Sequence, residues 1–92
     1  MAAFLVERYW PGLTAEAVAA VGSVLAVVGA HRGAVVVETV VSTRDEVCLW
    51  VVEAETQDQV ARSFAAAGVP VDRIGPVARH ANTPLPATRR QG

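Results

Sequence analysis

The chain has 92 residues, of which 52% are hydrophobic, and its formal net charge at pH 7 is −1. This length allows one domain. Because the apolar fraction is above the roughly 45–50% of an average soluble domain, we expect part of the apolar surface to form an interface. The basic residues are all arginine and do not form a large cluster. This composition excludes the usual pattern of a nucleic-acid-binding surface.

The single cysteine, Cys48, excludes an intramolecular disulfide and a cysteine-based metal knuckle. A reducing cytoplasm is therefore the expected compartment. The N-terminal residues have neither a charged leader nor a long apolar core, so no signal peptide is expected. The uncharged run over 17–30 is shorter than the about twenty residues of a membrane-spanning helix, so we expect no membrane partner. The absence of lysine and the abundance of alanine and valine are typical of a high-GC bacterial genome.

The first half of the chain predicts a strand, a helix and a second strand. Residues 3–9 are rich in large apolar side chains and are followed by a Pro-Gly pair, which is typical of a strand that ends in a turn. Thr14 offers a hydroxyl N-cap, and apolar residues recur at helical spacing over 15–30. The β-branched run over 34–42 then predicts the second strand.

The second half begins with a predicted hairpin. Polar residues 43–46 separate the second strand from another apolar run over 47–54, which predicts a third strand beside it. Thr56 and Gln59 fit the capping-box pattern, so a second helix should begin here. Gly68 is its expected C-terminal stop.

A fourth strand is predicted over 71–78, where apolar and polar residues alternate. Pro76 within this run implies an edge strand, because proline cannot donate a ladder hydrogen bond. Residues 79–92 contain two prolines and an arginine pair without apolar periodicity. We therefore predict a ferredoxin-like domain over 1–78 and a C-terminal tail over 79–92 that is flexible or becomes ordered on a partner.

Two βαβ halves that meet at a hairpin predict an α+β fold of the ferredoxin-like βαββαβ type. Right-handed crossovers then favour a four-stranded antiparallel sheet of order 4-1-3-2, with both helices on one face. If Ser42 pairs with Val47, one face holds Val36, Glu38, Val40, Val47, Leu49, Val51 and Glu53. The opposite face then holds Val35, Val37, Thr39, Val41, Cys48, Trp50 and Val52.

Both predicted faces are largely apolar, so both should be covered. The helices can cover only one of them. We expect a second copy of the chain to cover the other, which would produce a homodimer of the dimeric α/β-barrel type with a pocket or a dry seam between the sheets.

Three segments carry a family resemblance: FLVERYWPG at 4–12, VVETVVS at 36–42 and GVPVDRI at 68–74. On these motifs the chain resembles the bacterial family called domain of unknown function 4242. The resemblance implies a small ferredoxin-like protein, a dimer, and an association with nickel, because the family is loosely called nickel-binding.

The chain departs from this family at four positions of the sheet. Family members often have a histidine at the position of Glu38, aromatic residues at the positions of Val36 and Val40, and a cysteine near the position of Trp50. The departure removes the imidazole that would complete a simple nickel site. The resemblance therefore marks Glu38 as a position of interest without assigning nickel to it.

Carboxylates within apolar strands are the strongest candidates for a site, because a buried charge is costly unless it is paired, hydrated or used. Glu38 and Glu53 should share one face as diagonal neighbours, and Glu7 could join them. Such a cluster could hold a cation or provide an acid for proton transfer. The alternative is that these glutamates lie at sheet edges or form structural salt bridges with Arg8 and Arg73.

The other candidates are weaker. Tyr9 should lie on the same side of the first strand as Glu7. Trp50 could line a ligand pocket, although a strand tryptophan is more often a core or interface residue. His31 and His80 are the only imidazoles, and imidazole is a usual nickel or zinc ligand. A histidine in the last turn of a helix, such as His31, is commonly there because its cation suits that helix end. Cys48 should be a buried apolar thiol.

Three hypotheses on function follow. The first is a homodimeric binding protein for a small ligand or a divalent cation such as nickel. The second, from fold analogy alone, is a cofactor-free monooxygenase or isomerase with a glutamate base. The third is a structural or regulatory subunit whose apolar first helix and arginine-containing tail dock onto a partner. The candidate ligand-binding residues are Glu7, Tyr9, Glu38, Trp50 and Glu53, and the candidate metal ligands are Glu38, Glu53 and, more weakly, His31.

Overall fold

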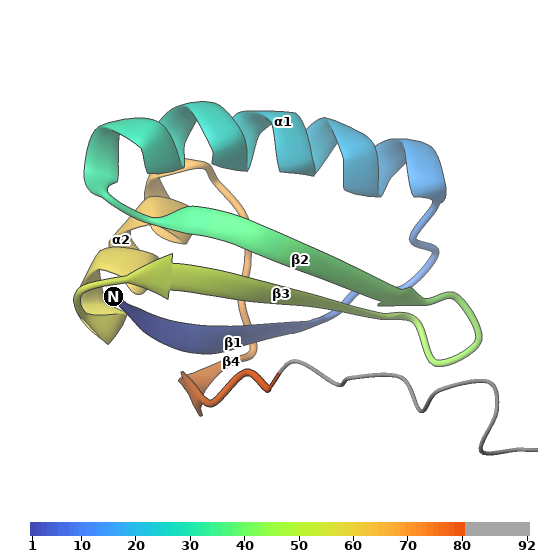
Figure 1. Cartoon of the computed structure of the whole chain (residues 1–92). Coiled ribbons are helices and arrows are strands. Elements are labelled where there is room, and N and C mark those ends of the chain that lie inside the picture. The colour runs from blue at the N-terminus through green and yellow to red at the C-terminus, as the bar shows by residue number, and fades with distance from the viewer. Residues whose placement is uncertain (81–92) are drawn as a thin grey trace, which may run out of the picture.

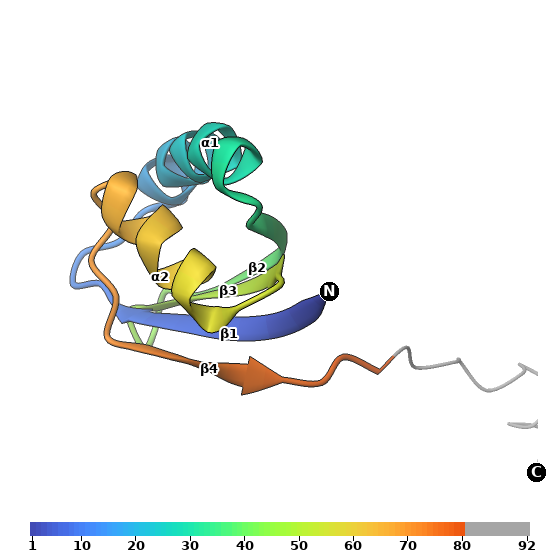
Figure 2. The same cartoon turned by 90° about the vertical axis from the view of Figure 1, so that its left-hand side faces the viewer.

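The computed structural model describes residues 1–80, which form four strands and two helices. The elements are β1 (Ala2–Tyr9), α1 (Ala15–Arg32), β2 (Val35–Ser42), β3 (Val47–Ala54), α2 (Gln57–Ala66) and β4 (Arg73–Val77). The strands form one antiparallel sheet of order β2-β3-β1-β4. Both helices lie on the same face of this sheet (Figures 1 and 2). The predicted α+β, ferredoxin-like βαββαβ fold is confirmed.

Both helices begin at the predicted caps. The side chain of Thr14 accepts a hydrogen bond from the first turn of α1 at 3.1 Å. At α2, Thr56 and Gln59 form the full capping box, with each side chain bound to the backbone of the other residue. Helix α1 extends to Arg32, beyond its predicted end, and stops at Gly33, whose φ of 75° suits the left-handed conformation of a C-terminal cap.

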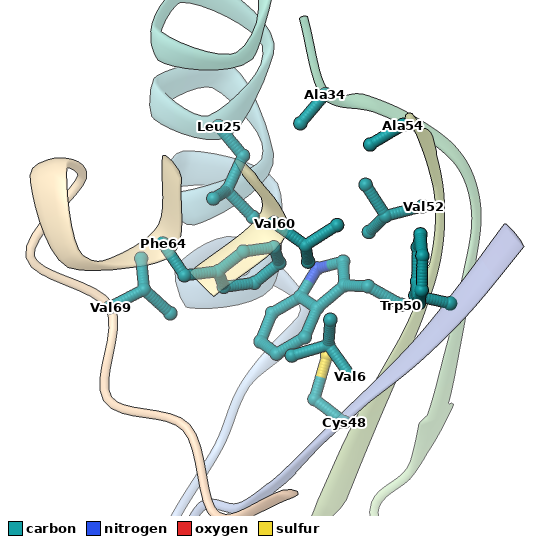
Figure 3. Packing of buried hydrophobic residues seen from close by; sticks show 11 residues of the cluster. Val6, Leu25, Ala34, Cys48, Trp50, Val52, Ala54, Val60, Phe64 and Val69 are labelled. Atoms are coloured by element: carbon teal, nitrogen blue, oxygen red, sulfur yellow. The ribbon is translucent and has the colours of Figure 1, made fainter. Parts of the chain in front are cut away.

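The hydrophobic core lies between the sheet and the helices (Figure 3). Strand β3 is central in the sheet and buries alternate side chains, which belong to Cys48, Trp50, Val52 and Ala54. The predicted burial of the Cys48 thiol is confirmed. The remaining core residues come from the other elements and loops: Phe4, Val6, Leu25, Ala34, Val60, Phe64 and Val69.

The pairing of β2 with β3 departs from the predicted register within β2. Glu38 lies opposite Val51, as expected, but the next pair toward the N-terminus joins Val36 to Val52. Val37 is therefore an extra residue in β2, and the strand contains a β-bulge. An extra residue of this kind reverses the alternation of side chains between the two faces for the rest of the strand.

The bulge overturns two of the predicted positions. Val36 faces the helices, where it packs against the core, and does not share a face with Glu38. Val35 lies opposite Glu53 and so belongs to the face without helices. Both predictions were wrong because they assumed an uninterrupted period of two along β2.

Helix α1 is apolar but is buried only along its inner side. By length and composition it could cross a membrane. One such helix near the N-terminus is weak evidence for a membrane span, because core helices of soluble proteins pass the same test. In this structure it packs on the sheet through the buried residues Leu25 and Gly29. Its outer side chains Val24 and Val27 are 45% and 64% exposed. Within residues 1–80, no segment covers this outer side of the helix.

The opposite side of the sheet, here called the open face, carries no helix among residues 1–80 (Figure 2). On the two central strands its side chains belong to Ala3, Leu5, Glu7, Tyr9, Val47, Leu49, Val51 and Glu53. Glu38 and Val40 continue the open face onto β2. This face is largely apolar, with a few carboxylates among aliphatic side chains.

Candidate functional site

Two of the predicted carboxylates lie close together on the open face. Glu38 on β2 is opposite Val51 on β3, and Glu53 is two positions further along β3. Residues in this relation are diagonal neighbours whose long side chains can reach a common point. The predicted diagonal placement of the two glutamates on one face is therefore confirmed by the strand pairing.

Arg79 lies between these two carboxylates. Its Nη2 atom is 3.9 Å from Oε1 of Glu38, and its Nη1 atom is 3.7 Å from Oε2 of Glu53. Both distances are longer than a hydrogen bond, so the contacts are loose ion pairs. The side chains are 47% exposed for Arg79, 53% for Glu38 and 38% for Glu53, so solvent screens the attraction. One guanidinium thus partly neutralises two carboxylates.

The segment that carries Arg79 borders a shallow hollow on the open face. Residues 78–80 follow β4 on the side of the sheet opposite α1 (Figures 1 and 2). The hollow between this segment and the sheet has a volume of about 560 Å³. Its lining combines aliphatic side chains with three polar ones and consists of Leu5, Glu38, Val51, Val77, Ala78, Arg79 and His80.

Glu7 forms a separate ion pair at the edge of the sheet. Its Oε2 atom accepts a hydrogen bond of 2.7 Å from Nε of Arg73, which lies opposite it on β4. This hydrogen bond and the carboxylate charge raise the pKa of Arg73. For Glu7 the alternative of a salt bridge with Arg73 is therefore realised. Arg8 does not pair with a glutamate, because it lies on the helix side with its guanidinium carbon 3.9 Å from the ring centroid of Trp10.

Tyr9 lies on the open face, at the end of the sheet next to the β2–β3 hairpin. Its hydroxyl donates a hydrogen bond of 3.4 Å to Oε1 of Glu46, and the other carboxylate oxygen of Glu46 accepts one of 2.7 Å from the backbone of Gly12. The ring is thus tied to the hairpin end. The structure does not bring Tyr9 together with Glu38.

The remaining predicted site residues lie on the helix side of the sheet. Trp50 is completely buried in the core, so its indole does not reach a ligand at the open face. This placement corrects the prediction that Trp50 lines the site and agrees with the alternative of a core residue. His31 is exposed in the last turn of α1, where Nδ1 lies 3.0 Å from the carbonyl oxygen of Val27. The sheet separates it from Glu38 and Glu53.

Comparison with known proteins places the chain in a family. The family described as nickel responsive protein SCO4226-like matches residues 4–77. The chain belongs to this family. The crystal structure of SCO4226 from Streptomyces coelicolor A3(2) is similar, with a TM-score of 0.79 and 18% sequence identity over 87% of this chain and 100% of that chain. No curated protein matches the chain.

The match to SCO4226 supports the ferredoxin-like fold, and at 18% identity it shows the fold alone. The description of the SCO4226-like family names nickel, as did the resemblance seen in the sequence motifs. That description does not contain the label domain of unknown function 4242, so the label stays a prediction.

A single copy of residues 1–80 does not present a nickel site. Nickel is usually bound by several nitrogen, oxygen or sulfur ligands, with imidazole among the preferred ones. Within these residues no three histidine, cysteine, aspartate or glutamate side chains gather closely enough to hold a metal ion. Of the predicted metal ligands only Glu38 and Glu53 come together, and Arg79 lies between them. The residues present therefore do not fit the metal named by the SCO4226-like family.

The site residue that the sequence did not indicate is Arg79, which the prediction assigned to the tail. His80, considered in the sequence only as an imidazole, also lines the hollow. The sequence does contain one signal for Arg79. This arginine directly follows the predicted fourth strand, while Glu38 and Glu53 lie within the predicted second and third strands and need a partner. That signal does not show which glutamates the arginine reaches, because β4 and β2 are opposite edges of the sheet. The rest of the predicted tail, 81–92, lies outside the described residues.

Proposed function

We propose that this protein is a homodimeric binding protein that encloses a small organic ligand at the open faces of two sheets, beside Glu38, Glu53 and Arg79. The observation that carries the proposal is an apolar sheet face without a helix, on which a hollow contains paired charges. The free and buried thiol of Cys48 supports a reducing compartment such as the cytoplasm.

The exposed aliphatic side chains of the open face support the homodimer. Val35 and Val40 are 49% and 46% exposed, and the central residues Leu5, Leu49 and Val51 are only half-buried. Soluble monomers rarely leave a continuous apolar face of this kind in water. A second copy related by a two-fold axis can cover it, because the open face of one copy then packs against the open face of the other. Sheets that pack face to face in this way lie about 10 Å apart.

The hollow supports an organic ligand. Sites for small molecules typically combine an apolar lining with a few polar groups that set the orientation of the ligand. Here Leu5, Val51 and Val77 provide the apolar lining, Glu38 can accept hydrogen bonds and Arg79 can donate them. A molecule with an apolar body, one donor and one acceptor would match these groups.

A divalent cation is the alternative occupant. The family description names nickel, and two carboxylates are suitable oxygen ligands for a metal ion. Because one described chain does not gather three metal-ligating side chains, a cation at Glu38 and Glu53 would need further donors from the second copy.

The mass in solution tests the homodimer. Light scattering of the full chain should give twice the chain mass of 9.6 kDa. The variant Leu49→Glu places a charge at the centre of the open face and should give the mass of one chain. Its matched control is Val27→Glu on the outer side of α1, where the side chain is 64% exposed, and this variant should remain a dimer. If Val27→Glu separates the copies and Leu49→Glu does not, the interface is α1 and the proposal is wrong.

A thermal-shift screen tests the ligand. The probes are nickel chloride, magnesium chloride and a panel of small amines, carboxylates and amides, each added to the dimer. A compound present at a hundred times its Kd stabilises the folded state by about 2.7 kcal/mol, which raises the Tm by several degrees. The shift should vanish in Glu38→Gln and remain in the control Glu7→Gln, whose carboxylate is paired elsewhere. A dimer that no probe stabilises would count against a binding protein.

A further inference from the structure

We propose that Arg79 determines which ligands the pair of Glu38 and Glu53 accepts, because its guanidinium is a built-in cation that keeps divalent metal ions out of the site. The inference rests on the proposed function for the position of the site. It extends that function by assigning specificity to a residue outside the predicted domain.

The geometry places one guanidinium where a shared metal ion would lie. Each of its two terminal nitrogens faces a different carboxylate, at 3.9 Å for Glu38 and 3.7 Å for Glu53. A divalent cation bound by both carboxylates would have to bring their oxygens to about 2.0–2.6 Å from its centre. The guanidinium of Arg79 is larger than such an ion and occupies the position between the two carboxylates.

The charge of the site leads to the same conclusion. Two carboxylates without a partner would carry two negative charges and would attract a divalent cation strongly. With Arg79 between them, only one net negative charge is left. A metal ion would have to displace the guanidinium before it could reach both carboxylates, and this displacement lowers its affinity.

The contacts of Arg79 differ from those of a structural salt bridge in the same molecule. Arg73 donates a hydrogen bond of 2.7 Å to Glu7, whereas both contacts of Arg79 are longer than a hydrogen bond. A guanidinium that is half-exposed and loosely held can turn toward an incoming molecule. It can then donate hydrogen bonds to a carbonyl or carboxylate of an organic ligand while Glu38 accepts from a donor on that ligand.

The hollow supports this class of ligand over a bare metal ion. Arg79 and Glu38 both line it, together with the aliphatic side chains of Leu5, Val51 and Val77. A hydrated metal ion gains nothing from an aliphatic lining, whereas the apolar body of an organic molecule does. We therefore assign the site to a small organic molecule that has both a hydrogen-bond acceptor and a donor.

Calorimetric titration with nickel chloride tests the role of Arg79. The wild-type chain should bind nickel weakly, and Arg79→Gln should bind it at least tenfold more tightly. Arg79→Lys keeps the positive charge and should resemble the wild type. The double variant with Arg79→Gln and Glu38→Gln should lose the gain, and the matched control Arg73→Gln should not show it.

The inference is overturned if Arg79→Gln gains no affinity for nickel, or if the wild-type chain already binds it as tightly as that variant. Circular dichroism and light scattering on each variant show whether it keeps the fold and the mass of the wild type. The two proposals fail in different ways. A monomeric wild-type chain with no thermal shift contradicts the proposed function, whereas unchanged nickel affinity in a dimeric Arg79→Gln variant contradicts only the role of Arg79.

Discussion

The indole ring of Trp50 packs edge-on against the phenyl ring of Phe64, with ring centroids 5.2 Å apart and an angle of 66° between the planes. Trp50 belongs to the central strand β3 and Phe64 to α2, and both side chains are almost completely buried. The two rings occupy the centre of the core (Figure 3). This contact therefore joins the sheet to the second helix.

Truncation of Phe64 should destabilise the domain strongly. Phe64→Ala removes the ring and leaves a cavity beside Trp50, and changes of this type cost about 3–5 kcal/mol of unfolding free energy. Phe64→Leu keeps most of the volume and should cost much less. Urea unfolding measures both values. Equal effects of the two variants would show that the volume beside Trp50 is not what the core requires.

Replacement of two glycines of α1 by alanine should change the stability of the domain in opposite directions. A methyl group at Gly29 would collide with the backbone carbonyl oxygen of Ala34, whereas one at Gly22 would meet no atom within 4 Å. Gly29→Ala should therefore destabilise the domain by about 1–3 kcal/mol through overpacking. Gly22→Ala should stabilise it by about 0.5–1 kcal/mol, because alanine favours a helix interior over glycine.

Thermal unfolding of the two glycine variants, run side by side, checks the prediction. The substitution is the same and both positions lie in α1, so helix propensity contributes equally to each. A difference in Tm between the variants thus reports the packing of α1 on the segment that leads into β2. Similar Tm values would contradict the close approach of Gly29 and Ala34.

The thiol of Cys48 should be unreactive in the folded protein. Burial raises its pKa above the ordinary value of 9.0, and the nearby Arg8 lowers it by a smaller effect. A disulfide reagent at pH 8 should therefore modify Cys48 slowly in the native state and rapidly in urea. Rapid modification without urea would show that β3 opens frequently near this residue.

The same shift predicts how stability depends on alkaline pH. Because the thiol pKa is higher in the folded state, the unfolded chain loses its proton first as pH rises above about 9. Each such deprotonation favours unfolding, so the free energy of unfolding should fall with pH in this range. Cys48→Ala removes this contribution, and its urea-unfolding curves should show a weaker decrease than the wild type.

The ion pair of Glu7 and Arg73 should contribute modestly and in a salt-dependent manner. The contact is hydrogen-bonded at 2.7 Å, but the Arg73 side chain is 74% exposed, so salt screens the attraction. Arg73→Gln should lower the Tm slightly at low ionic strength, and the difference should shrink in 1 M sodium chloride. A Tm difference that does not change with salt would indicate packing in place of an ion pair.

Much of the fold could be predicted from the sequence because its signals are local. The hydroxyl of Thr14 and the pair of Thr56 and Gln59 lie within one helical turn of the groups that they cap, so both helix starts followed from short patterns. The alternation along 47–54 likewise predicted which side chains of β3 enter the core. Pro76 indicated an edge strand, and β4 is one.

The candidate site could be predicted only in part. The face shared by Glu38 and Glu53 followed from the hairpin register, since the turn at 43–46 sets the pairing of the nearest residues. The bulge at Val37 did not follow, because it interrupts the alternation along β2 at a point that only the pairing with β3 reveals. The expectation that Trp50 contacts a ligand was wrong as well. The predicted register did place it on the same face as Cys48, but the sequence did not show how completely the helices bury that face.

By itself the sequence determined the order and type of the elements, the caps of both helices and the apolar character of both sheet faces, since these depend on residues close together in the chain. Only the tertiary structure decided that Arg79 meets Glu38 and Glu53. These residues are on segments from opposite edges and the centre of the sheet, and their meeting depends on how the chain crosses the open face after β4. No local pattern encodes that path.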